Sequence, residues 1–536
     1  MPSYSDAQPL STQQTILCLL FIIIASFFTY FWNYAYPPNV FWDENYHIAS
    51  AQKYLHGVYF MEQHPPLGKL LVALGEKIIH PNARTDQFLG TDYGTNFPAG
   101  FSFAGYRFFS ALLAWWTAPV LFILFLLLTR NALWGTFLSF LYVFDNALIV
   151  HMRGAMLEGP LLFFSALTIV GFLLVIRSLE KRSAIPTSPR LRGAGSDQRS
   201  ATANWKLRAK SFTAATIFFG IFFALAMTTK VVSLVFILLV PVILYRIFIR
   251  NSQFAIRNWP LALRFLLIFV ISFAVPYIAI WQTHFSLGSQ INPSLPDLGY
   301  YQASAPYKKI LKTHTNASLL SFPVMLRDSW KFVAHYNGGA PRLDLCKADE
   351  NGSPFYFWPL GARSINYRWE TPDGNSYRYL FLQANPVVWW TSFAAVLIAG
   401  SLLLCSVIAP PKNPLPHRFE LTTFLGLYVA YMLAISRITR VMYLYHYFLP
   451  LLFSFVILAL VFMDLRQIGR IVLLEASKTL CLMVLGGLIF LSFQFYRPLT
   501  YYLPIIDEQF QRRVIFSLWE LHCVHCEKVS GLVVTR

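Results

Sequence analysis

The sequence predicts an all-α integral membrane protein with about eleven transmembrane helices and two large outer loops. Of its 536 residues, 56% are hydrophobic and only 13% are charged, which is too apolar for a soluble chain of this length. Eleven runs lack Asp, Glu, Lys and Arg, and they reach or approach the roughly 20 residues that cross a bilayer core. Segments rich in Lys and Arg separate some of these runs in a regular order.

The apolar runs are the candidate spans, taken in chain order. The first run has 22 residues and follows a polar, nearly uncharged N-terminus. It is longer than the apolar core of a signal peptide, so we expect it to be retained as an anchor. His446 interrupts the tenth run, and long flanking side chains that reach the interface extend the shorter runs. The runs are 15–36, 108–129, 131–144, 159–176, 211–229, 231–245, 265–283, 386–409, 421–436, 441–463 and 479–496.

The basic residues predict the orientation of the chain. Segment 177–210 contains nine Lys and Arg against two acids, and segment 246–264 contains four Arg and no acid. If the runs alternate in direction, both segments lie on the side of the N-terminus, which the positive-inside rule makes cytoplasmic. The net charge of +18 then reflects orientation and phospholipid contact. Nucleic-acid binding is excluded as a main role because the basic residues flank spans rather than forming a stripe.

This orientation divides the chain into four parts. We assign 1–283 to an N-terminal transmembrane half that includes the outer loop 37–107. Residues 284–385 form a second large outer loop, 386–496 the C-terminal transmembrane helices, and 497–536 an outer tail. The cytoplasmic stretch 183–204 is rich in Ser, Pro, Gly and Arg, a composition typical of a flexible linker.

The two outer loops have different local patterns. In the first loop, Asp43 to His56 lacks Pro and Gly and predicts a short helix that Gly57 ends. Pro65-Pro66 opens a second helix that runs to about Ile79, and we expect both helices to lie along the membrane surface. The second loop has turn signals such as Asn337-Gly338-Gly339 and Pro372-Asp373-Gly374 between aromatic pieces, so we interpret it as a packed irregular cap.

The adjacent acids Asp43 and Glu44 are the most informative pair in the sequence. Carboxylates beside a membrane are costly unless they perform chemistry or bind a charged group. One interpretation is electrostatic stabilisation of a helix N-terminus, which contributes about 0.3–1 kcal/mol. The other is that one carboxylate accepts a proton from an incoming hydroxyl. The residue pattern alone leaves both open.

Further charged residues are expected at the same outer side. They can pair locally with acids such as Asp145 and Glu158, or together bind the phosphate of a lipid in the outer leaflet, where Arg and Lys would stabilise a leaving phosphate. This set comprises Arg107, His151, Arg153, Lys230, Arg437 and Arg440.

Several strings together carry a family resemblance. FWDENYHIASAQKYLHGVYFMEQHPPLGK at 41–69 resembles the first lumenal loop of the protein O-mannosyltransferases, which use dolichyl- or polyprenyl-phosphate mannose. The resemblance continues in the remaining strings, which occur in the expected order along most of the chain. These strings are GYRFFSAL (105–112), RGAMLEGPLLFFSAL (153–167), TTKVVSLV (228–235), SPFYFWPLGARSINYRW (353–369), ANPVVWW (384–390) and YLYHYFLPLLF (443–453).

The resemblance implies a fold, a reaction and roles for residues. It implies a GT-C fold and inverting transfer of mannose from a polyprenyl phosphate to Ser or Thr hydroxyls, with Asp43 as the base. Glu44 would position the acceptor or the helix, and Arg107 would bind a nearby carboxylate or the donor phosphate. The leaving lipid phosphate is a stable anion, so neither a metal nor another cofactor is implied. The substrate-binding candidates are His64, Lys69, Arg107, Arg153, Glu158, Lys230, Arg440, Tyr445 and His446.

The length of the second loop distinguishes this chain within that family. The eukaryotic enzymes carry a lumenal MIR domain there, and 284–385 is too short to contain one. The chain therefore resembles a compact, bacterial-type member, and we expect a bacterial plasma membrane, with the endoplasmic reticulum as the alternative. The partners implied are the lipid-linked donor, an acceptor polypeptide, the phospholipid membrane and a second chain in a homo- or heterodimer.

Two other functions are compatible with many spans and outer charges. A related GT-C enzyme could move another sugar, such as aminoarabinose, to a lipid, although the HPPLGK and YHYFLP strings favour mannosyl transfer. A secondary transporter would show paired broken helices, which Pro241, Pro276 and Pro450 do not form. In the tail, Cys523 and Cys526 have CxxC spacing, but no second ligand pair accompanies them, so a disulfide or inert thiols explain them as well as a metal site.

Overall fold

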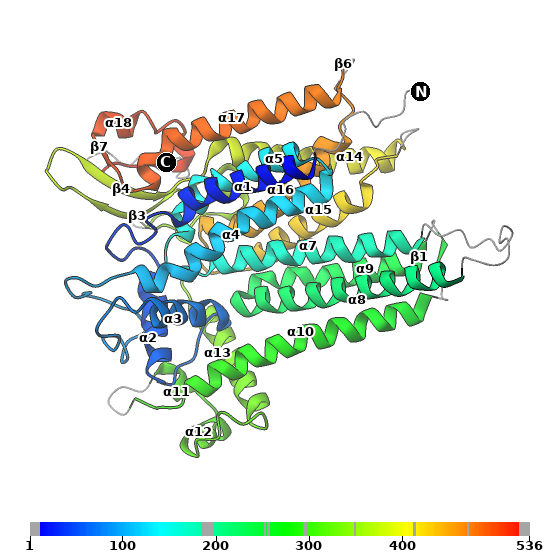
Figure 1. The fold of residues 1–536 in the computed structure, drawn as a ribbon. Coiled ribbons are helices and arrows are strands. Elements are labelled where there is room, and N and C mark those ends of the chain that lie inside the picture. Colours follow the sequence, from blue (N-terminus) through cyan, green and yellow to red (C-terminus); the bar gives the residue numbers. More distant parts are fainter. Residues whose placement is uncertain are drawn as a thin grey trace.

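The computed structural model describes residues 11–183, 198–250, 253–254, 258–292, 297–347, 350–410, 414–468 and 471–524. Long helices run side by side in one bundle, and both large loops emerge at the same end, on the left in Figure 1. We call this end the outer end. Within the described residues, ten helices are long and apolar enough to cross a membrane, and a bent pair makes an eleventh candidate. The prediction of about eleven spans is therefore confirmed.

The spans coincide with the apolar runs of the sequence. Several combine an α-helix with a shorter helix of another type, and α16 lies in the centre of the bundle with nearly all its side chains buried. Their bounds are α1 Thr12–Ser26 with the π-helix η1 Phe27–Phe31, α4 Ala104–Thr129, α7 Glu158–Ser183, α8 Gln198–Thr229, η2 Val231–Leu238 with α9 Leu239–Phe248, α10 Trp259–Leu287, α14 Pro386–Ile408, α15 Arg418–Ile435, η5 Leu444–Tyr447 with α16 Phe448–Asp464, and α17 Glu475–Thr500.

The bent pair explains why the third apolar run is short. Helix α5 (Ala132–Val143) and helix α6 (Asn146–Met152) meet at 62°. Asp145 lies between them, and its Oδ1 accepts a hydrogen bond of 2.9 Å from the backbone N–H of Leu148. Its Oδ2 accepts a second bond of 2.8 Å from Trp389 Nε1. Asp145 is therefore a buried N-cap that starts a new helix and turns the chain at the outer end.

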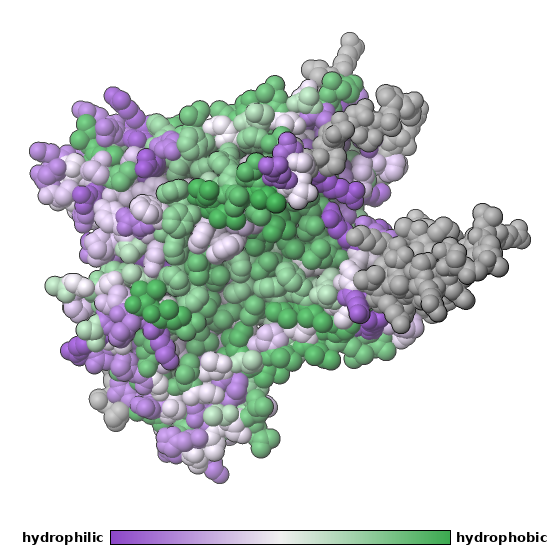
Figure 2. Space-filling view, viewed as in Figure 1, coloured by the Kyte–Doolittle hydropathy of each residue, from purple (hydrophilic) through white to green (hydrophobic). Residues whose placement is uncertain are grey.

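The surface of the bundle has the polarity of a membrane protein. In Figure 2 the hydrophobic side chains form a wide band over the middle of the helices, and hydrophilic residues gather at the ends. Many large apolar side chains on α1, α10, α14 and α17 are exposed. Exposed apolar surface on this scale is expected where lipid replaces water as the solvent. The chain is thus a multi-pass integral membrane protein.

The first outer loop folds as its sequence predicts. Helix α2 spans Glu44–Leu55 and helix α3 spans Leu67–Ile79. Gly57, with φ of +68°, follows the first helix, where a residue with a side chain would be strained. Both helices lie at the outer end of the bundle, where α2 packs against α3 and α3 packs against α4 (Figure 1).

The second outer loop is more regular than we predicted. Rather than an irregular cap, it contains the 18-residue helix α13 Phe322–Gly339, and Gly338-Gly339 complete this helix instead of forming a turn. Strands β3 Ile365–Glu370 and β4 Tyr377–Leu382 form an antiparallel hairpin, and β7 Pro504–Ile505 of the tail adds to β4. Gly374, with φ of +75°, lies in the predicted turn between β3 and β4. The remaining elements of the loop are α11 Leu298–Gln302, α12 Ala305–Lys312 and the 3₁₀ helix η4 Phe355–Leu360.

The remaining elements are short. The tail continues from β7 into α18 Asp507–Gln511 and the 3₁₀ helix η6 Ser517–Trp519, while β1 Ile249–Arg250 pairs with β2 Gln253–Phe254 and β5 Gln467–Ile468 with β6 Ile471–Val472 at the opposite end. Most of the predicted linker 183–204 and the Cys526 side of the tail cluster lie outside the described residues.

Candidate active site

Asp43 immediately precedes α2, and its side chain does not cap the helix. No side-chain capping bond is formed there, and Asp43 Oδ2 instead accepts a hydrogen bond of 3.1 Å from the hydroxyl of Tyr445. Burial raises the pKa of Asp43, and the opposing influences are the nearby charges of His151 and Lys230 and the Tyr445 bond. The side chain is partly exposed, so this carboxylate of raised pKa keeps some contact with its surroundings outside the protein core.

Glu44 has a different environment from its neighbour. It is fully buried and forms a two-point ion pair with Arg107, with Nε to Oε1 at 2.6 Å and Nη2 to Oε2 at 2.8 Å. The same carboxylate accepts bonds from the backbone N–H groups of Phe41 and Ala155 at 3.1 and 2.8 Å. Glu44 therefore ties the start of α2 to two distant segments of the chain.

Arg107 completes this tie with backbone contacts. Its Nη1 donates to the carbonyls of Ala35 and Pro37 at 2.7 and 2.6 Å, and its Nη2 donates to the carbonyl of Asn39 at 2.7 Å. An Arg side chain has five N–H groups, and with the Glu44 pair all five are used within the described chain. The contact that the structure shows is thus with a carboxylate, and no N–H of Arg107 remains for a donor phosphate in this arrangement.

A network of buried polar side chains lies next to Asp43. His151 Nε2 is 2.7 Å from Glu158 Oε2, and His151 Nδ1 is 2.6 Å from the hydroxyl of Tyr367 on β3. Lys230 bonds the other oxygen of Glu158, and its ammonium lies 5.3 Å from the centre of the Tyr445 ring. Glu158 thus holds one cation and one histidine on a single carboxylate, and the Tyr445 ring separates this group from Asp43.

Aromatic rings enclose the same region. Trp42 stacks on Tyr367 at 4.9 Å between ring centres, and His151 stacks on Tyr445 at 4.7 Å. Tyr445 in turn stacks on His446 at 4.6 Å. These planes fix the orientation of the polar groups and limit the entry of water, which strengthens electrostatic interactions at the site.

A cavity of about 630 Å³ opens beside this network. Its polar end is lined by His64, Lys230, Arg437, Arg440 and His446. Its other walls are apolar and come from η2, from α15 and from the residues that follow α15, such as Val231, Val235, Leu238, Ala434 and Ile438. A basic end joined to an apolar groove along two spans matches a lipid that carries an anionic head.

Two of the charges at the polar end are available to a ligand. Within the described residues, the side chains of Arg437 and Arg440 form no ion pair or hydrogen bond. Burial and the nearby Lys230 and Lys69 lower the pKa of His64 well below its ordinary value, so this ring is neutral at pH 7. The cavity therefore combines two unpaired guanidinium groups with a neutral histidine.

Two predicted substrate-binding residues lie elsewhere or are already paired. Lys69 forms a buried ion pair with Glu62 and donates to Ser50 at 3.1 Å. Arg153 donates to the carbonyls of Trp32 and Asn33 at 2.9 and 2.6 Å and lines a different cavity. The structure thus brings together Asp43, Glu158, Lys230, Tyr445, His446, His64 and Arg440, while Glu44 and Arg107 support the loop that carries Asp43.

Sequence reasoning did not select Trp42 and Tyr367, two aromatic residues that contribute to this site, and it gave His151 no individual role. Trp42 and Tyr367 form its aromatic wall, and His151 joins Tyr367 to Glu158. His151 stood in the set of outer charged residues, and Tyr367 stood within a string that carried the family resemblance. Their convergence depends on contacts across more than 200 residues, which no local pattern reveals. No group of three or more His, Cys, Asp and Glu suited to a metal occurs in the described parts of the chain.

Comparison with solved structures defines the class of the fold. The chain superposes on a chain of the Saccharomyces cerevisiae protein O-mannosyltransferase Pmt1–Pmt2 complex bound to the sugar donor, with a TM-score of 0.75 over 95% of this chain and 93% of that chain, at 13% identity. The fold is therefore that of a multi-pass GT-C membrane protein.

Sequence comparison defines the family. The model "Dolichyl-phosphate-mannose-protein mannosyltransferase" matches residues 20–188, and the model for the C-terminal four-helix region of protein O-mannosyltransferase matches 330–519. The chain belongs to the protein O-mannosyltransferase family. It is 33% identical to dolichyl-phosphate-mannose–protein mannosyltransferase 4 of Schizosaccharomyces pombe over 30% of this chain and 20% of that protein. For mannosyltransferase 1 of Saccharomyces cerevisiae the identity is 30% over 26% and 16%. These alignments span a fifth or less of the relatives' length.

Proposed function

We propose that this protein transfers mannose from a polyprenyl phosphate to Ser or Thr hydroxyls of proteins at the outer membrane face, with inversion at the anomeric carbon. The observation that carries the proposal is the cavity with an apolar groove and a basic end beside a carboxylate of raised pKa. The family membership and the relatives, which are dolichyl-phosphate-mannose–protein mannosyltransferases, support the same reaction.

The donor fits the cavity in one direction. Its polyprenyl chain would lie in the groove between η2 and α15, and its phosphate would contact Arg440 and Arg437, with Lys230 next to them. Arg side chains can grip a phosphate at two points, and Lys acts as a point charge. In this proposed pose the mannosyl carbon lies toward His446, which stacks on Tyr445, the residue that bonds Asp43.

The reaction then requires one proton acceptor and one stabilised leaving group. As the acceptor oxygen forms its bond to the anomeric carbon, the bond from that carbon to the phosphate oxygen breaks, and Asp43 takes the hydroxyl proton. The electron pair of the broken bond leaves on the lipid phosphate, which Lys230 and Arg440 stabilise. Because the phosphate leaves as a stable anion, the step requires no metal and no further cofactor.

Residues around the base act as positioning residues in this proposal. Glu44 and Arg107 hold the segment from Ala35 to Phe41 and thereby fix Asp43. Glu158 holds Lys230 and His151, and His446 stacks on Tyr445 at the cavity wall. His64 offers a neutral ring to the sugar or the phosphate.

The proposal includes an assembly and a compartment. The Saccharomyces cerevisiae relative is described as a Pmt1–Pmt2 complex, and we propose that this chain also pairs, with a second copy or a related chain. We propose a bacterial plasma membrane because the second outer loop is too short for the lumenal domain of the eukaryotic enzymes, with the endoplasmic reticulum as the alternative. The mass of the purified protein in detergent tests the pairing. Localisation of the tagged protein in cells tests the compartment.

The direct test is transfer in vitro. Purified full-length protein in detergent is incubated with polyprenyl phosphate carrying labelled mannose and with peptides rich in Ser and Thr. We expect the peptide to carry label that β-elimination releases. The Asp43→Asn variant should transfer mannose roughly 10²–10⁴-fold more slowly than the wild type. Transfer to lipid only, or transfer of aminoarabinose but not mannose from the matching donors, would contradict the proposed reaction.

A further inference from the structure

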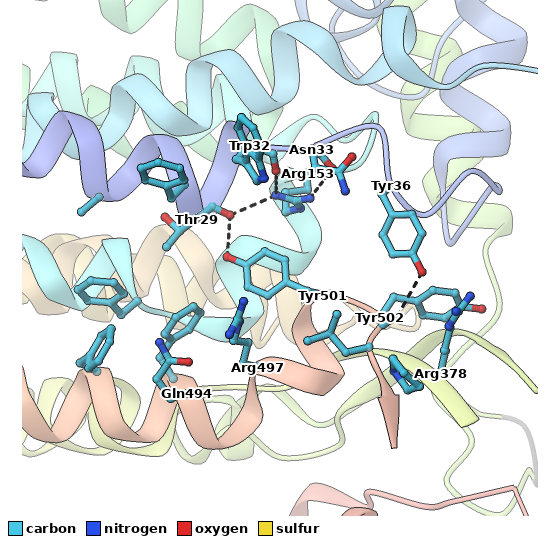
Figure 3. Close-up of a pocket in the computed structure, with 17 residues that line it drawn as sticks. Thr29, Trp32, Asn33, Tyr36, Arg153, Arg378, Gln494, Arg497, Tyr501 and Tyr502 are labelled. Atoms are coloured by element: carbon cyan, nitrogen blue, oxygen red, sulfur yellow. Dashed lines mark hydrogen bonds between the residues drawn. The ribbon is translucent and has the colours of Figure 1, made fainter. Parts of the chain in front are cut away.

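A second cavity lies on another side of the bundle, between the outer ends of α1–η1 and α17. Its volume is about 640 Å³. Apolar and aromatic side chains line its inner part, among them Phe28 on η1 and Phe490 and Phe493 on α17. Figure 3 shows that three arginines from different elements, Arg153, Arg378 and Arg497, border its other part.

The charge of this cavity is unbalanced. Arg378 pairs with Glu370 through Nη1 at 3.2 Å, while its buried Nε has no hydrogen-bond partner in the described chain. Arg153 donates to backbone carbonyls and lies 5.0 Å from the ring of Tyr501, and no acid among the described residues pairs with it. Arg497 is exposed, and its side chain forms no ion pair within the described residues. The cavity lining itself contains no Asp or Glu.

A polar group without a partner points to a ligand at the same place. The buried Nε of Arg378 is such a group, and it lies at the part of the cavity that Tyr502 also borders, where the Tyr502 hydroxyl contacts Arg368 and Glu370. Gln494 lies one helical turn before Arg497 on α17 and also borders the cavity. Buried polar groups without a partner are costly, so an acceptor group in the cavity would relieve this cost.

We propose that this cavity binds an anionic phospholipid of the outer leaflet, with the phosphate at Arg497 and Arg378 and an acyl chain against Phe28 and Phe493. The cavity lies at the outer ends of two spans, which is the depth of lipid head groups. Phe28 is 56% exposed on the membrane face of the bundle, so lipid can enter sideways. The apolar part favours a lipid over a free phosphate, because an ion alone would leave this surface uncovered.

The bound lipid would also contact the segment that leads to Asp43. Thr29, Trp32 and Asn33 line the cavity, and their carbonyls accept bonds from Arg153. This segment continues directly into the carbonyls held by Arg107. Occupation of the cavity therefore stabilises the chain that precedes the candidate base.

Lipid titration of the purified full chain tests this site. Delipidated protein in detergent is titrated with phosphatidylglycerol or with phosphatidylcholine of the same acyl chains, and bound lipid is counted by native mass spectrometry. We expect the wild type to retain phosphatidylglycerol in preference to phosphatidylcholine. Because one basic residue near the membrane surface contributes a severalfold preference, Arg497→Ala should weaken phosphatidylglycerol binding about fivefold, and Arg497→Glu should weaken it further.

Controls separate this site from the donor cavity and from a loss of folding. Arg512→Glu changes an exposed arginine of the same outer end that does not line the cavity and should leave binding unchanged. Lipid bound in the donor cavity contributes equally to all variants. The quantity that reports on this site is therefore the difference in bound phosphatidylglycerol between the wild type and the Arg497 variants. Unfolding midpoints in lipid-free detergent should be equal for all variants. Equal retention of the two lipids by the wild type overturns the proposal, and so does equal phosphatidylglycerol binding by Arg497→Glu and Arg512→Glu. Complete displacement of phosphatidylglycerol by inorganic phosphate at the same concentration also overturns it.

Discussion

Tyr445→Phe tests how the site tunes its candidate base. If Asp43 accepts the proton, it must be ionised, so activity is lost as the pH falls through its pKa. Burial raises that pKa above the ordinary value of 3.8, and the acidic limb of the profile of kcat/KM against pH should lie above 3.8. The Tyr445 bond stabilises the ionised form and so opposes this rise. Removing the hydroxyl should therefore move the acidic limb to higher pH.

The size of the shift follows from the hydrogen bond. Bonds to a charged group contribute about 1.5–3 kcal/mol, and 3.1 Å is long for such a bond between two oxygens. We therefore take the lower end, about 1.5 kcal/mol, which corresponds to a shift of about one pKa unit. At a pH well above the limb, Asp43 is ionised in both proteins, and turnover should differ little.

The assay is the rate of mannose transfer at low donor concentration between about pH 4 and 8. Tyr443→Phe is the matched control, because Tyr443 stacks on Tyr445 at 5.6 Å and its hydroxyl does not bond Asp43. Its acidic limb should coincide with that of the wild type. A limb that stays in place in Tyr445→Phe, or moves to lower pH, would refute the assignment of the limb to Asp43.

The other predictions concern the base, its support, the phosphate site and the orientation. Asp43→Asn should reduce the chemical step by roughly 10²–10⁴-fold with donor affinity retained, measured by single turnover and donor binding. Arg107→Ala leaves the charge of Glu44 buried and unpaired, so it should destabilise the fold by about 3–5 kcal/mol, seen as a lower unfolding midpoint, whereas a stable but inactive variant would argue for a direct role. Arg440→Ala should raise the KM for the donor at least severalfold with partial recovery in Arg440→Lys, and an unchanged KM would remove this residue from the phosphate site. A maleimide reagent that does not cross membranes should label the exposed Cys346 in whole cells and lose this signal in Cys346→Ser; labelling only after permeabilisation would reverse the orientation.

The sequence was sufficient for features that depend on local chemistry. The number of spans follows from apolar length, and α2 and α3 follow from Gly57 and the Pro65-Pro66 pair. The turn at Pro372-Asp373-Gly374 was predicted for the same reason. Each of these depends on the conformational preferences of a few neighbouring residues or on the thickness of a bilayer.

Features that depend on distant contacts were not predictable in this way. The pairing of Glu44 with Arg107 joins residues 63 positions apart, and a sequence pattern cannot show that this pair and three backbone carbonyls together use every N–H of the arginine. Helix α13 was missed because its Gly338-Gly339 end has the signature of a turn. The apolar run at 131–144 gave no sign of the bend at Asp145, since the cap became apparent only from its bond to the Leu148 backbone.

The distribution of charge at the site matches the charge that the proposed reaction moves. The donor phosphate diester carries one negative charge, and the released lipid phosphate carries up to two, while Asp43 loses its charge when it takes the proton. The net charge of the site is therefore conserved, but one unit moves from the Asp43 side to the phosphate side. Arg437 and Arg440 lie on the phosphate side without a partner among the described residues, and Lys230 lies between the two sides, bonded to Glu158 and facing the Tyr445 ring. Because these cations are in place before the reaction, the protein needs little rearrangement to stabilise the charge that develops on the leaving group.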